Sequence, residues 1–198
     1  MITIGVTGGS GCGKTTLLAV WRRLGCASVD ADGIYHRLLA EDEGLIKAIA
    51  AAFPQAVAGG VLDRKKLGGI VFADKQELLR LEGITHGVIL PAIYARMDKA
   101  RRQNAPAEAI DAIRLFESPL MDLCDVVVTV TAPLSQRLTR IVARDGVSEA
   151  YAKSRLAAQP DMAYYRAQAD YWIENKGPTE LFEQECQKLY EKIVGGPA

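Results

Sequence analysis

Two hydrophobic periods alternate along the chain and predict its secondary structure. Continuous apolar and β-branched runs are typical of strands buried in a parallel sheet, and they occupy residues 2–7, 26–29, 108–115, 125–131 and 169–174. Apolar positions three and four residues apart predict helices at residues 14–24, 133–144 and 179–194. A further helix is expected after Ser148, which we predict as its N-cap. Strands that alternate with helices are typical of a doubly wound parallel sheet, so we predict a three-layer α/β fold.

The middle of the chain breaks this alternation. Residues 33–104 have no strand pattern, and apolar spacing predicts helices at residues 33–52, 63–71, 73–85 and 88–103, with a loop at 54–62. Asp63 is a good N-cap for its helix, and Pro91 fits the first turn of the last one. We therefore expect residues 1–32 and 105–198 to form the α/β core and residues 33–104 to form a helical insertion.

Residues 8–15 read Gly-Gly-Ser-Gly-Cys-Gly-Lys-Thr, the G-x-x-x-x-G-K-T pattern of phosphate-binding loops, and they join a predicted strand to a predicted helix. Glycines let backbone N–H groups turn inward around an anion, and the helix N-terminus adds partial positive charge. We expect Lys14 to reach the β- and γ-phosphates and the Thr15 hydroxyl to ligate Mg²⁺. The alternative is a glycine-rich turn without a ligand. The strand and helix on either side favour a P-loop NTPase fold that binds a nucleoside triphosphate.

The four cysteines are scattered through the chain without a C-x-x-C pair, which is typical of small buried hydrophobes in a reducing compartment and does not fit a zinc site. Cys12 lies inside the phosphate loop, and helix N-termini lower the pKa of a thiol. We therefore expect Cys12 to be reactive and ATP binding to be sensitive to oxidation.

Two aspartates, Asp30 and Asp32, follow the second predicted strand, at the edge where doubly wound folds place their active sites. A carboxylate there can orient or deprotonate an acceptor hydroxyl and can help to hold Mg²⁺. Either residue could instead cap the helix that follows. For Asp30 the two interpretations are equally open, and for Asp32 we favour catalysis.

Three arginines share one face of the helix predicted after Pro133, because Arg137, Arg140 and Arg144 are spaced i, i+3 and i+7. Guanidinium groups that converge on a transferring phosphoryl group stabilise its charge. The alternative is a solvated basic face that pairs with Asp145 and Glu149. The phosphate loop in the same chain favours the functional interpretation.

Charge and hydropathy exclude several partners. The 198 residues include 24 Lys+Arg and 24 Asp+Glu, and this balance argues against a general nucleic-acid binder. No segment reaches the ~18 consecutive apolar residues of a membrane span. The N-terminus enters a strand without a basic signal region. We therefore expect a cytoplasmic protein with no nucleic-acid or membrane partner, and no sequence feature indicates an obligate protein partner.

Other motifs narrow the class of phosphate-loop protein. A GTPase is expected to carry N-K-x-D, but Asn175-Lys176-Gly177-Pro178 lacks the aspartate. A motor or transport ATPase is expected to have a hydrophobic strand that ends in an acid, and Asp111 is a weak match. The aspartates, the loop and the arginine-rich helix are instead typical of a small-molecule kinase, with a base, a phosphate site and a closing lid.

An ordered set of motifs resembles bacterial dephospho-CoA kinases nearly end to end. Residues 7–16 are similar to the family's T-G-G-x-G-x-G-K-[ST]-T, and residues 30–32 to its D-A-D. Residues 62–67 resemble L-D-R-x-x-L, and residues 81–86 resemble L-E-x-I-x-H. The later matches are Arg140, Arg144-Asp145-Gly146, Arg155 to Gln159, Ala169-Asp170-Tyr171 and Asn175.

The resemblance implies that ATP phosphorylates the ribose 3′-hydroxyl of dephospho-CoA, the last step of coenzyme A synthesis. It implies catalytic roles for Asp32 as the base, for Lys14 and for Arg140, and a helical lid at about residues 137–165. Dephospho-CoA would bind residues 33–104, and its implied contacts are Asp32, Arg64, His86 and Arg155. The implied ATP-binding residues are Gly8, Gly9, Ser10, Gly11, Cys12, Gly13, Lys14, Thr15, Thr16, Arg140 and Asn175, the last near the adenine. Mg²⁺ would be held by Thr15, with Asp32 as a second candidate. His86 alone could equally be a structural cap at a helix boundary.

The chain departs from the family pattern at two positions. Gly87 stands where proline usually follows the histidine, so we expect a looser turn there. Arg114 stands in the strand that usually ends P-L-L-F-E, so its side chain must reach solvent or an anion. Both departures concern acceptor binding more than ATP binding. They motivate one alternative, a non-catalytic nucleotide- or CoA-binding relative. A second alternative is another nucleoside or nucleotide kinase of the same fold, and the helical insertion with L-D-R-x-x-L argues against it.

Overall fold

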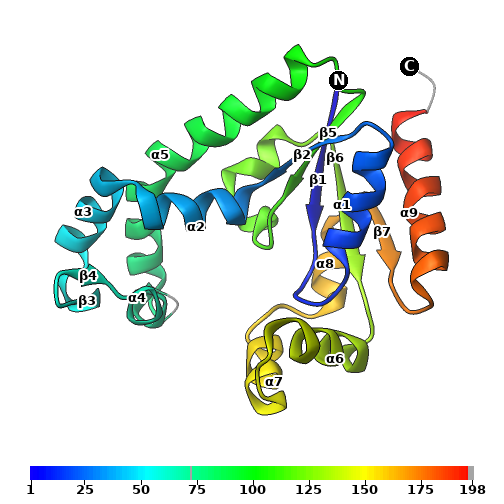
Figure 1. Cartoon of the computed structure of the whole chain (residues 1–198). Coiled ribbons are helices and arrows are strands. Elements are labelled where there is room, and N and C mark those ends of the chain that lie inside the picture. Colours follow the sequence, from blue (N-terminus) through cyan, green and yellow to red (C-terminus); the bar gives the residue numbers. More distant parts are fainter. Residues whose placement is uncertain (72, 196–198) are drawn as a thin grey trace. The chain divides into compact units, whose positions relative to one another are not determined.

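The computed structural model describes residues 1–71 and 73–195. Five strands in this part of the chain form a parallel sheet in the order β2-β5-β1-β6-β7 (Figure 1). They are β1 (Ile2–Thr7), β2 (Ala27–Asp30), β5 (Ala107–Asp111), β6 (Val126–Thr131) and β7 (Tyr171–Glu174). Every pairing in this sheet is parallel, so crossover connections join its successive strands, and the α/β prediction is confirmed.

The chain divides into two compact units. One unit is Met1–Asp30 with Lys99–Ala198, and the other is Ala31–Asp98. The helices are α1 (Lys14–Arg23), α2 (Ala31–Glu41), α3 (Glu43–Ala52), α4 (Arg64–Val71), α5 (Lys75–Arg102), α6 (Leu134–Asp145), α7 (Glu149–Ala157), α8 (Met162–Gln168) and α9 (Thr179–Val194). Short 3-10 turns are η1 (Pro54–Ala56), η2 (Leu115–Glu117) and η3 (Pro119–Leu123).

Both faces of the central strand β1 are covered, as the apolar run predicts. Ile4 and Val6 point to one face and belong to a buried cluster that includes residues of α1 and α9. Gly5 points to the opposite face, where an added Cβ would lie 2.6 Å from Leu115 of η2. Figure 1 shows α1 and α9 side by side on their face of the sheet. The unit is therefore layered, with helical segments on both sides of the strands.

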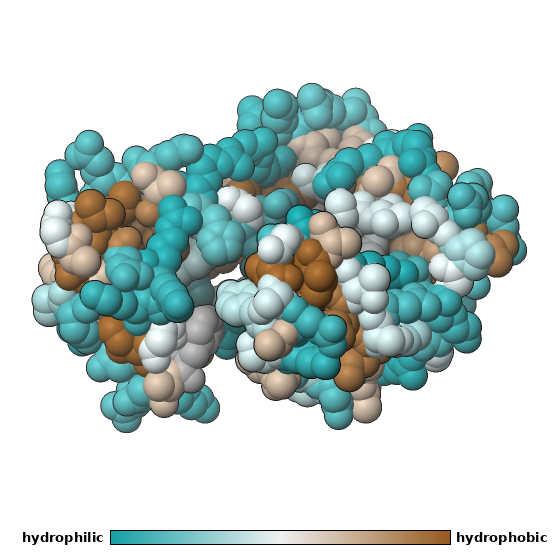
Figure 2. Space-filling view, turned by 60° about the horizontal axis from the view of Figure 1, so that its bottom comes forward, coloured by the Kyte–Doolittle hydropathy of each residue, from teal (hydrophilic) through white to brown (hydrophobic). Residues whose placement is uncertain are grey.

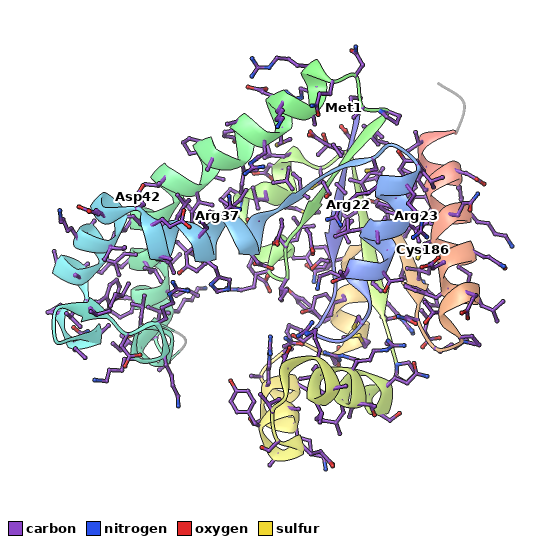
Figure 3. All side chains as sticks on the ribbon, in the orientation of Figure 1. Met1, Arg22, Arg23, Arg37, Asp42 and Cys186 are labelled. Atoms are coloured by element: carbon purple, nitrogen blue, oxygen red, sulfur yellow. The ribbon has the colours of Figure 1, made fainter. Side chains whose placement is uncertain are left out.

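The contact between α1 and α9 combines apolar burial with polar anchors. Trp21 is fully buried, and its indole N–H donates to the carbonyl oxygen of Cys186 at 2.9 Å. At the end of α1, Arg22 donates to Ser28 Oγ of β2 at 2.7 Å, whereas Arg23 lies on the side of α9 that carries Cys186 (Figure 3). Arg23 forms an ion pair with Glu183 at 2.7 Å. These contacts fix the helix that begins at the phosphate loop.

The second unit has its own apolar core, which includes Leu45, Ile49 and Phe53. Asp42 caps α3 by accepting from the N–H of Leu45, and Figure 3 shows it at the junction with α2. Asp63 accepts from the N–H groups of Lys65 and Lys66, so the predicted cap and the helix that ends at Val71 are confirmed. Capped helices around one apolar cluster are what the helical spacing predicts for this segment.

The expectation that residues 54–62 form a loop without strands is wrong. Strands β3 (Val57–Ala58) and β4 (Val61–Leu62) pair as a short antiparallel hairpin. Gly59 and Gly60 join them with φ values of +57° and +80°. Two positive φ values in a two-residue connection favour a tight hairpin, and Gly-Gly is a signal for it.

The two helices expected at residues 73–85 and 88–103 form one helix, α5, which has 28 residues. Pro91 lies inside this helix and not in a first turn. A proline ring crowds the carbonyl of the residue four positions earlier, here Gly87, and bends the helix. Figure 1 shows a bend along α5. The looser turn expected at Gly87 and the helix boundary expected at His86 are therefore both absent from the described structure.

Strand β5 ends at Asp111, earlier than the strand expected over residues 108–115. Arg114 precedes the 3-10 turn η2 and is exposed. The expected arginine inside a central strand is therefore wrong. The pattern misled because Ala112, Ile113 and Leu115 are apolar, so the hydrophobic run continues after the last ladder position.

The surface is mixed in character. Figure 2 shows mainly hydrophilic and intermediate residues on the drawn face, with hydrophobic side chains in separate groups. Within residues 1–71 and 73–195, no helix has the length and apolar character that a membrane crossing requires.

Candidate active site

The phosphate loop lies between β1 and α1, and its backbone requires glycine. Gly8, Gly11 and Gly13 have φ values of +132°, +77° and +107°, which side chains rarely allow. A Cβ on Gly8 would also collide with the carbonyl oxygen of Val130, and one on Gly13 with the amide of Asn175. The predicted strand, loop and helix are therefore confirmed, and the loop is packed closely on its surroundings.

Three successive loop carbonyls accept hydrogen bonds from side chains of other elements. Arg137 Nε donates to Ser10 O at 3.0 Å, Arg140 Nη1 donates to Gly11 O at 3.2 Å, and Asn175 Nδ2 donates to Cys12 O at 3.0 Å. In a trans peptide the next N–H points opposite to the carbonyl. The N–H groups of Gly11 and Gly13 therefore turn away from these donors, the arrangement of an anion-binding loop.

Lys14 and Thr15 begin α1 directly after the loop. Lys14 Nζ donates to Gly8 O at 2.8 Å, so the ammonium group lies over the loop. Thr15 is exposed in the first turn and Thr16 is half-buried. These positions give the helix N-terminus a cation and an exposed hydroxyl where an anion with its metal ion would bind.

The three arginines of α6 have three different environments. Arg137 is only 4% exposed, and its guanidinium binds the protein. Arg140 is half-buried and also donates to Gln136 and Asn175. Arg144 is exposed and pairs with Asp145 at 2.6 Å. The shared helix face does not make a single phosphate site, and for Arg144 the solvated ion pair is confirmed.

Arg155, an implied acceptor contact, also pairs with Asp145, with 2.8 Å between Nη1 and Oδ2. The hydrogen bond from Arg144, together with Arg155, holds the pKa of Asp145 below its usual range. Arg144, Asp145 and Arg155 therefore link the end of α6 to α7. Ser148 caps α7 as predicted, accepting from the N–H of Tyr151.

Asn175 connects the loop to Arg140. Its side chain is buried, donates to Cys12 O and accepts from Arg140 Nη2 at 3.0 Å. The residue follows β7, whose last position, Glu174, pairs in register with Thr131 of β6. The sheet therefore sets the position of Asn175, and Asn175 holds the loop and the arginine together.

The expectation of a reactive Cys12 is wrong. Its thiol is fully buried and lies 3.9 Å from the sulfur of Met162. Burial raises the pKa of Cys12 above its ordinary value, and the nearby positive charges of Arg137 and Lys14 offset this only in part. Burial also raises the pKa of the thiols of Cys26, Cys124 and Cys186 to about 12. All four thiols are free, as expected of small hydrophobes.

Two acids lie at the carboxyl edge of the sheet. Asp30 ends β2 and is in register with Asp111 of β5, which is in register with Val6 of β1. The sequence offered Asp111 only as a weak match to an ATPase acid, because its position next to β1 depends on strand order. In the structure it lies on the strand that neighbours the one leading into the phosphate loop.

The implied acceptor-side residues belong mostly to the unit Ala31–Asp98. Asp32 is half-buried in the first turn of α2, which begins at Ala31, so Asp32 is not the N-cap residue. Arg64 is exposed at the start of α4, and His86 is half-buried within α5. Their roles remain predictions. In the described residues, no group of three or more His, Cys, Asp or Glu side chains is arranged to hold a metal ion.

Comparison with known proteins identifies the family. A family model described as dephospho-CoA kinase matches residues 2–180. The chain belongs to the dephospho-CoA kinase family. A dephospho-CoA kinase of Geobacter sulfurreducens is 34% identical over 194 residues, which are 97% of this chain and 98% of that protein.

Solved structures agree with this assignment. A dephospho-CoA kinase from Campylobacter jejuni has a TM-score of 0.67 and 32% identity, with 98% of each chain covered. A structure from Thermus thermophilus has a TM-score of 0.81 and 31% identity, and the match covers 100% of this chain and 98% of that chain. The family and its kinase class are therefore established for this chain.

Two residues of this dephospho-CoA kinase family member have loop contacts that the sequence analysis missed. Arg137 was expected at phosphate and instead holds the loop backbone. In the sequence, Gln159 is only the last residue of a family motif, but in the structure its amide bonds to Ser10. Helical spacing could place Arg137 on the face of α6 that also carries Arg140 and Arg144. Only the packing of α7 on α6 brings Gln159 to the loop.

Proposed function

We propose that this chain transfers the γ-phosphoryl group of ATP to the ribose 3′-hydroxyl of dephospho-CoA and produces CoA and ADP. The observation that carries the proposal is the geometry of the phosphate loop, in which three carbonyl oxygens accept hydrogen bonds from Arg137, Arg140 and Asn175. The loop belongs to a chain of the dephospho-CoA kinase family. A loop already held in this shape loses little entropy when it binds a triphosphate.

ATP binding is proposed at the loop. The N–H groups of Gly11 and Gly13 would donate hydrogen bonds to phosphate oxygens. Lys14 Nζ would leave Gly8 O and bind the β- and γ-phosphates. The exposed Thr15 hydroxyl suits Mg²⁺, which prefers oxygen ligands and keeps several waters. When bound, Mg²⁺ would neutralise phosphate charge. Asp32 is a second candidate ligand.

The acceptor is proposed to bind the unit Ala31–Asp98, with Asp32, Arg64 and His86 as contacts and Arg155 from α7. Asp32 would take the proton of the ribose 3′-hydroxyl while the 3′-oxygen bonds to the γ-phosphorus. The bond between the γ-phosphorus and the β,γ-bridging oxygen would break, and ADP would leave. Arg140 would stabilise the transferring charge, and α6 and α7 would form the closing lid.

Two small molecules, ATP and dephospho-CoA, are the partners in this proposal. We also propose a cytoplasmic location, because free thiols suit a reducing compartment.

A coupled ADP-release assay tests the proposal, with dephospho-CoA, adenosine and nucleoside monophosphates as acceptors. Release with dephospho-CoA far above the others is expected, and Lys14→Ala should weaken both ATP binding and turnover. Preferred turnover of adenosine or a monophosphate would indicate a nucleoside or nucleotide kinase. ATP binding without release for any acceptor would indicate a non-catalytic relative.

A further inference from the structure

Ser10 of the phosphate loop is held at all of its polar groups by two side chains. Its N–H donates to Gln159 Oε1 at 2.9 Å, and its Oγ accepts from Gln159 Nε2 at 2.8 Å. Its carbonyl accepts from Arg137 Nε at 3.0 Å. Arg137 Nη2 also donates to Gln159 Oε1 at 2.9 Å, so the two side chains support each other.

The backbone around Gln159 fixes where its side chain can go. Gln159 follows α7, and its own N–H donates to Leu156 O at 3.2 Å. Pro160 comes next and restricts the conformation of the residue before it. Ile141, Ala152 and Leu156 form a buried cluster that packs α7 on α6. Gln159 therefore reaches Ser10 from a backbone position that the packing of α7 on α6 fixes.

Gly9 provides a second observation at the same place. A Cβ on Gly9 would collide with Arg137 Nη2 and would lie 2.9 Å from Gln159 Oε1. The two side chains therefore occupy the space that a loop side chain would need. The loop and the pair Arg137–Gln159 fit each other closely.

We infer that Gln159 is a positioning residue for ATP, which acts through Ser10 and links α7 to the phosphate loop. Gln159 Oε1 accepts the hydrogen bond of the Ser10 N–H, so this N–H does not face the phosphates. By fixing this residue it sets the orientation of the N–H groups of the following loop residues. The inference rests on the proposed function only in that ATP binds this loop.

The test compares the intact protein with Gln159→Leu, which removes the amide and keeps a similar volume. Gln168→Leu is the matched control, since Gln168 is exposed at the end of α8 and donates to Tyr164 O. ATP binding is measured by calorimetry without an acceptor, and KM for each substrate is measured with the coupled assay. Thermal unfolding reports folding of each variant.

We expect Gln159→Leu to raise the Kd and KM for ATP about tenfold, a difference of about 1.4 kcal/mol, with KM for dephospho-CoA unchanged. Gln168→Leu should match the wild type. Ser10→Ala, which removes only the hydroxyl, should raise the Kd about threefold. The double variant should be no weaker than Gln159→Leu, because the two residues act through one contact.

An unchanged ATP Kd in Gln159→Leu overturns the inference, as does an equal rise in KM for both substrates. If Gln159→Leu fails to fold, an unchanged Kd in Ser10→Ala overturns it instead. A wild-type protein that binds no ATP overturns the proposed function together with the inference. Failure of the inference alone, with ATP binding intact in the wild type, is therefore distinguishable from failure of the proposed function.

Discussion

Asn175→Ala removes the contact that joins the phosphate loop to the last strand. The wild-type side chain donates to Cys12 O at 3.0 Å and accepts from Arg140 Nη2 at 3.0 Å. In the variant, the Cys12 carbonyl loses this donor in a buried site, whereas Arg140 keeps Gln136 and Gly11 as partners. A buried polar group left without its partner costs about 1–3 kcal/mol in the free energy of unfolding.

For a chain of this length, 1 kcal/mol corresponds to a shift of about 2–4 °C in Tm. We therefore expect Asn175→Ala to lower Tm by about 2–12 °C. The Cys12 peptide also becomes free to rotate, so ATP affinity should fall by about two- to tenfold. Thermal unfolding without ligand and calorimetry with ATP measure the two effects separately.

Two further variants make the test specific. Gln187→Ala removes an exposed side chain of α9 that bonds to Glu191, and it should change stability by less than about 0.5 kcal/mol. Asn175→Asp keeps the acceptor for Arg140 and loses the donor to Cys12, so its ATP affinity should also fall. Wild-type Tm and wild-type ATP affinity in Asn175→Ala would refute the role of Asn175 in shaping the loop.

Three other predictions follow from the same structure. Asp32→Asn should lower turnover about 10²–10⁴-fold in steady-state assays while the ATP Kd stays near wild type, and near-normal turnover would remove Asp32 from the base role. Gly13→Ala should lower Tm and abolish measurable ATP binding, because a residue with a Cβ would have to adopt a φ of +107° there and the Cβ would collide with Asn175. A variant that binds ATP with wild-type affinity in calorimetry would contradict the packing described for the loop. The thiols of Cys26 and Cys186 have pKa values raised from 9.0 to about 12, so the folded state favours their neutral forms. Urea unfolding should therefore show full stability below pH 9 and a loss as pH rises toward 12, and equal stability at about pH 7 and pH 10 would count against it.

The sequence predicted the elements whose signals are local and strong. The β1–loop–α1 unit has a complete motif between a buried strand and an amphipathic helix, and α9 has the expected bounds of Thr179–Val194. Caps at Asp63 and Ser148 depend on a side chain and a nearby N–H, and both predictions are correct. Such features need no knowledge of the rest of the fold.

The errors arose where packing decides. A proline in a helical pattern normally begins or ends a helix, but α5 continues through Pro91. Cys12 lies near a helix N-terminus, yet its thiol points into the core, and burial raises its pKa. Arg137 has the spacing of a phosphate ligand, but it is buried against Ser10. For Cys12 and Arg137 the local rule is correct physics, and tertiary packing is stronger.

The central claim is that this chain adds a phosphate to the ribose 3′-oxygen of dephospho-CoA. The most direct measurement is product analysis after incubation with Mg²⁺, ATP and dephospho-CoA, with mass spectrometry for the added phosphate and ³¹P NMR for its position. The account predicts one 3′-phosphate formed for each ADP released, and none with Lys14→Ala. A phosphate at another position, or ADP release without phosphorylated product, would contradict it.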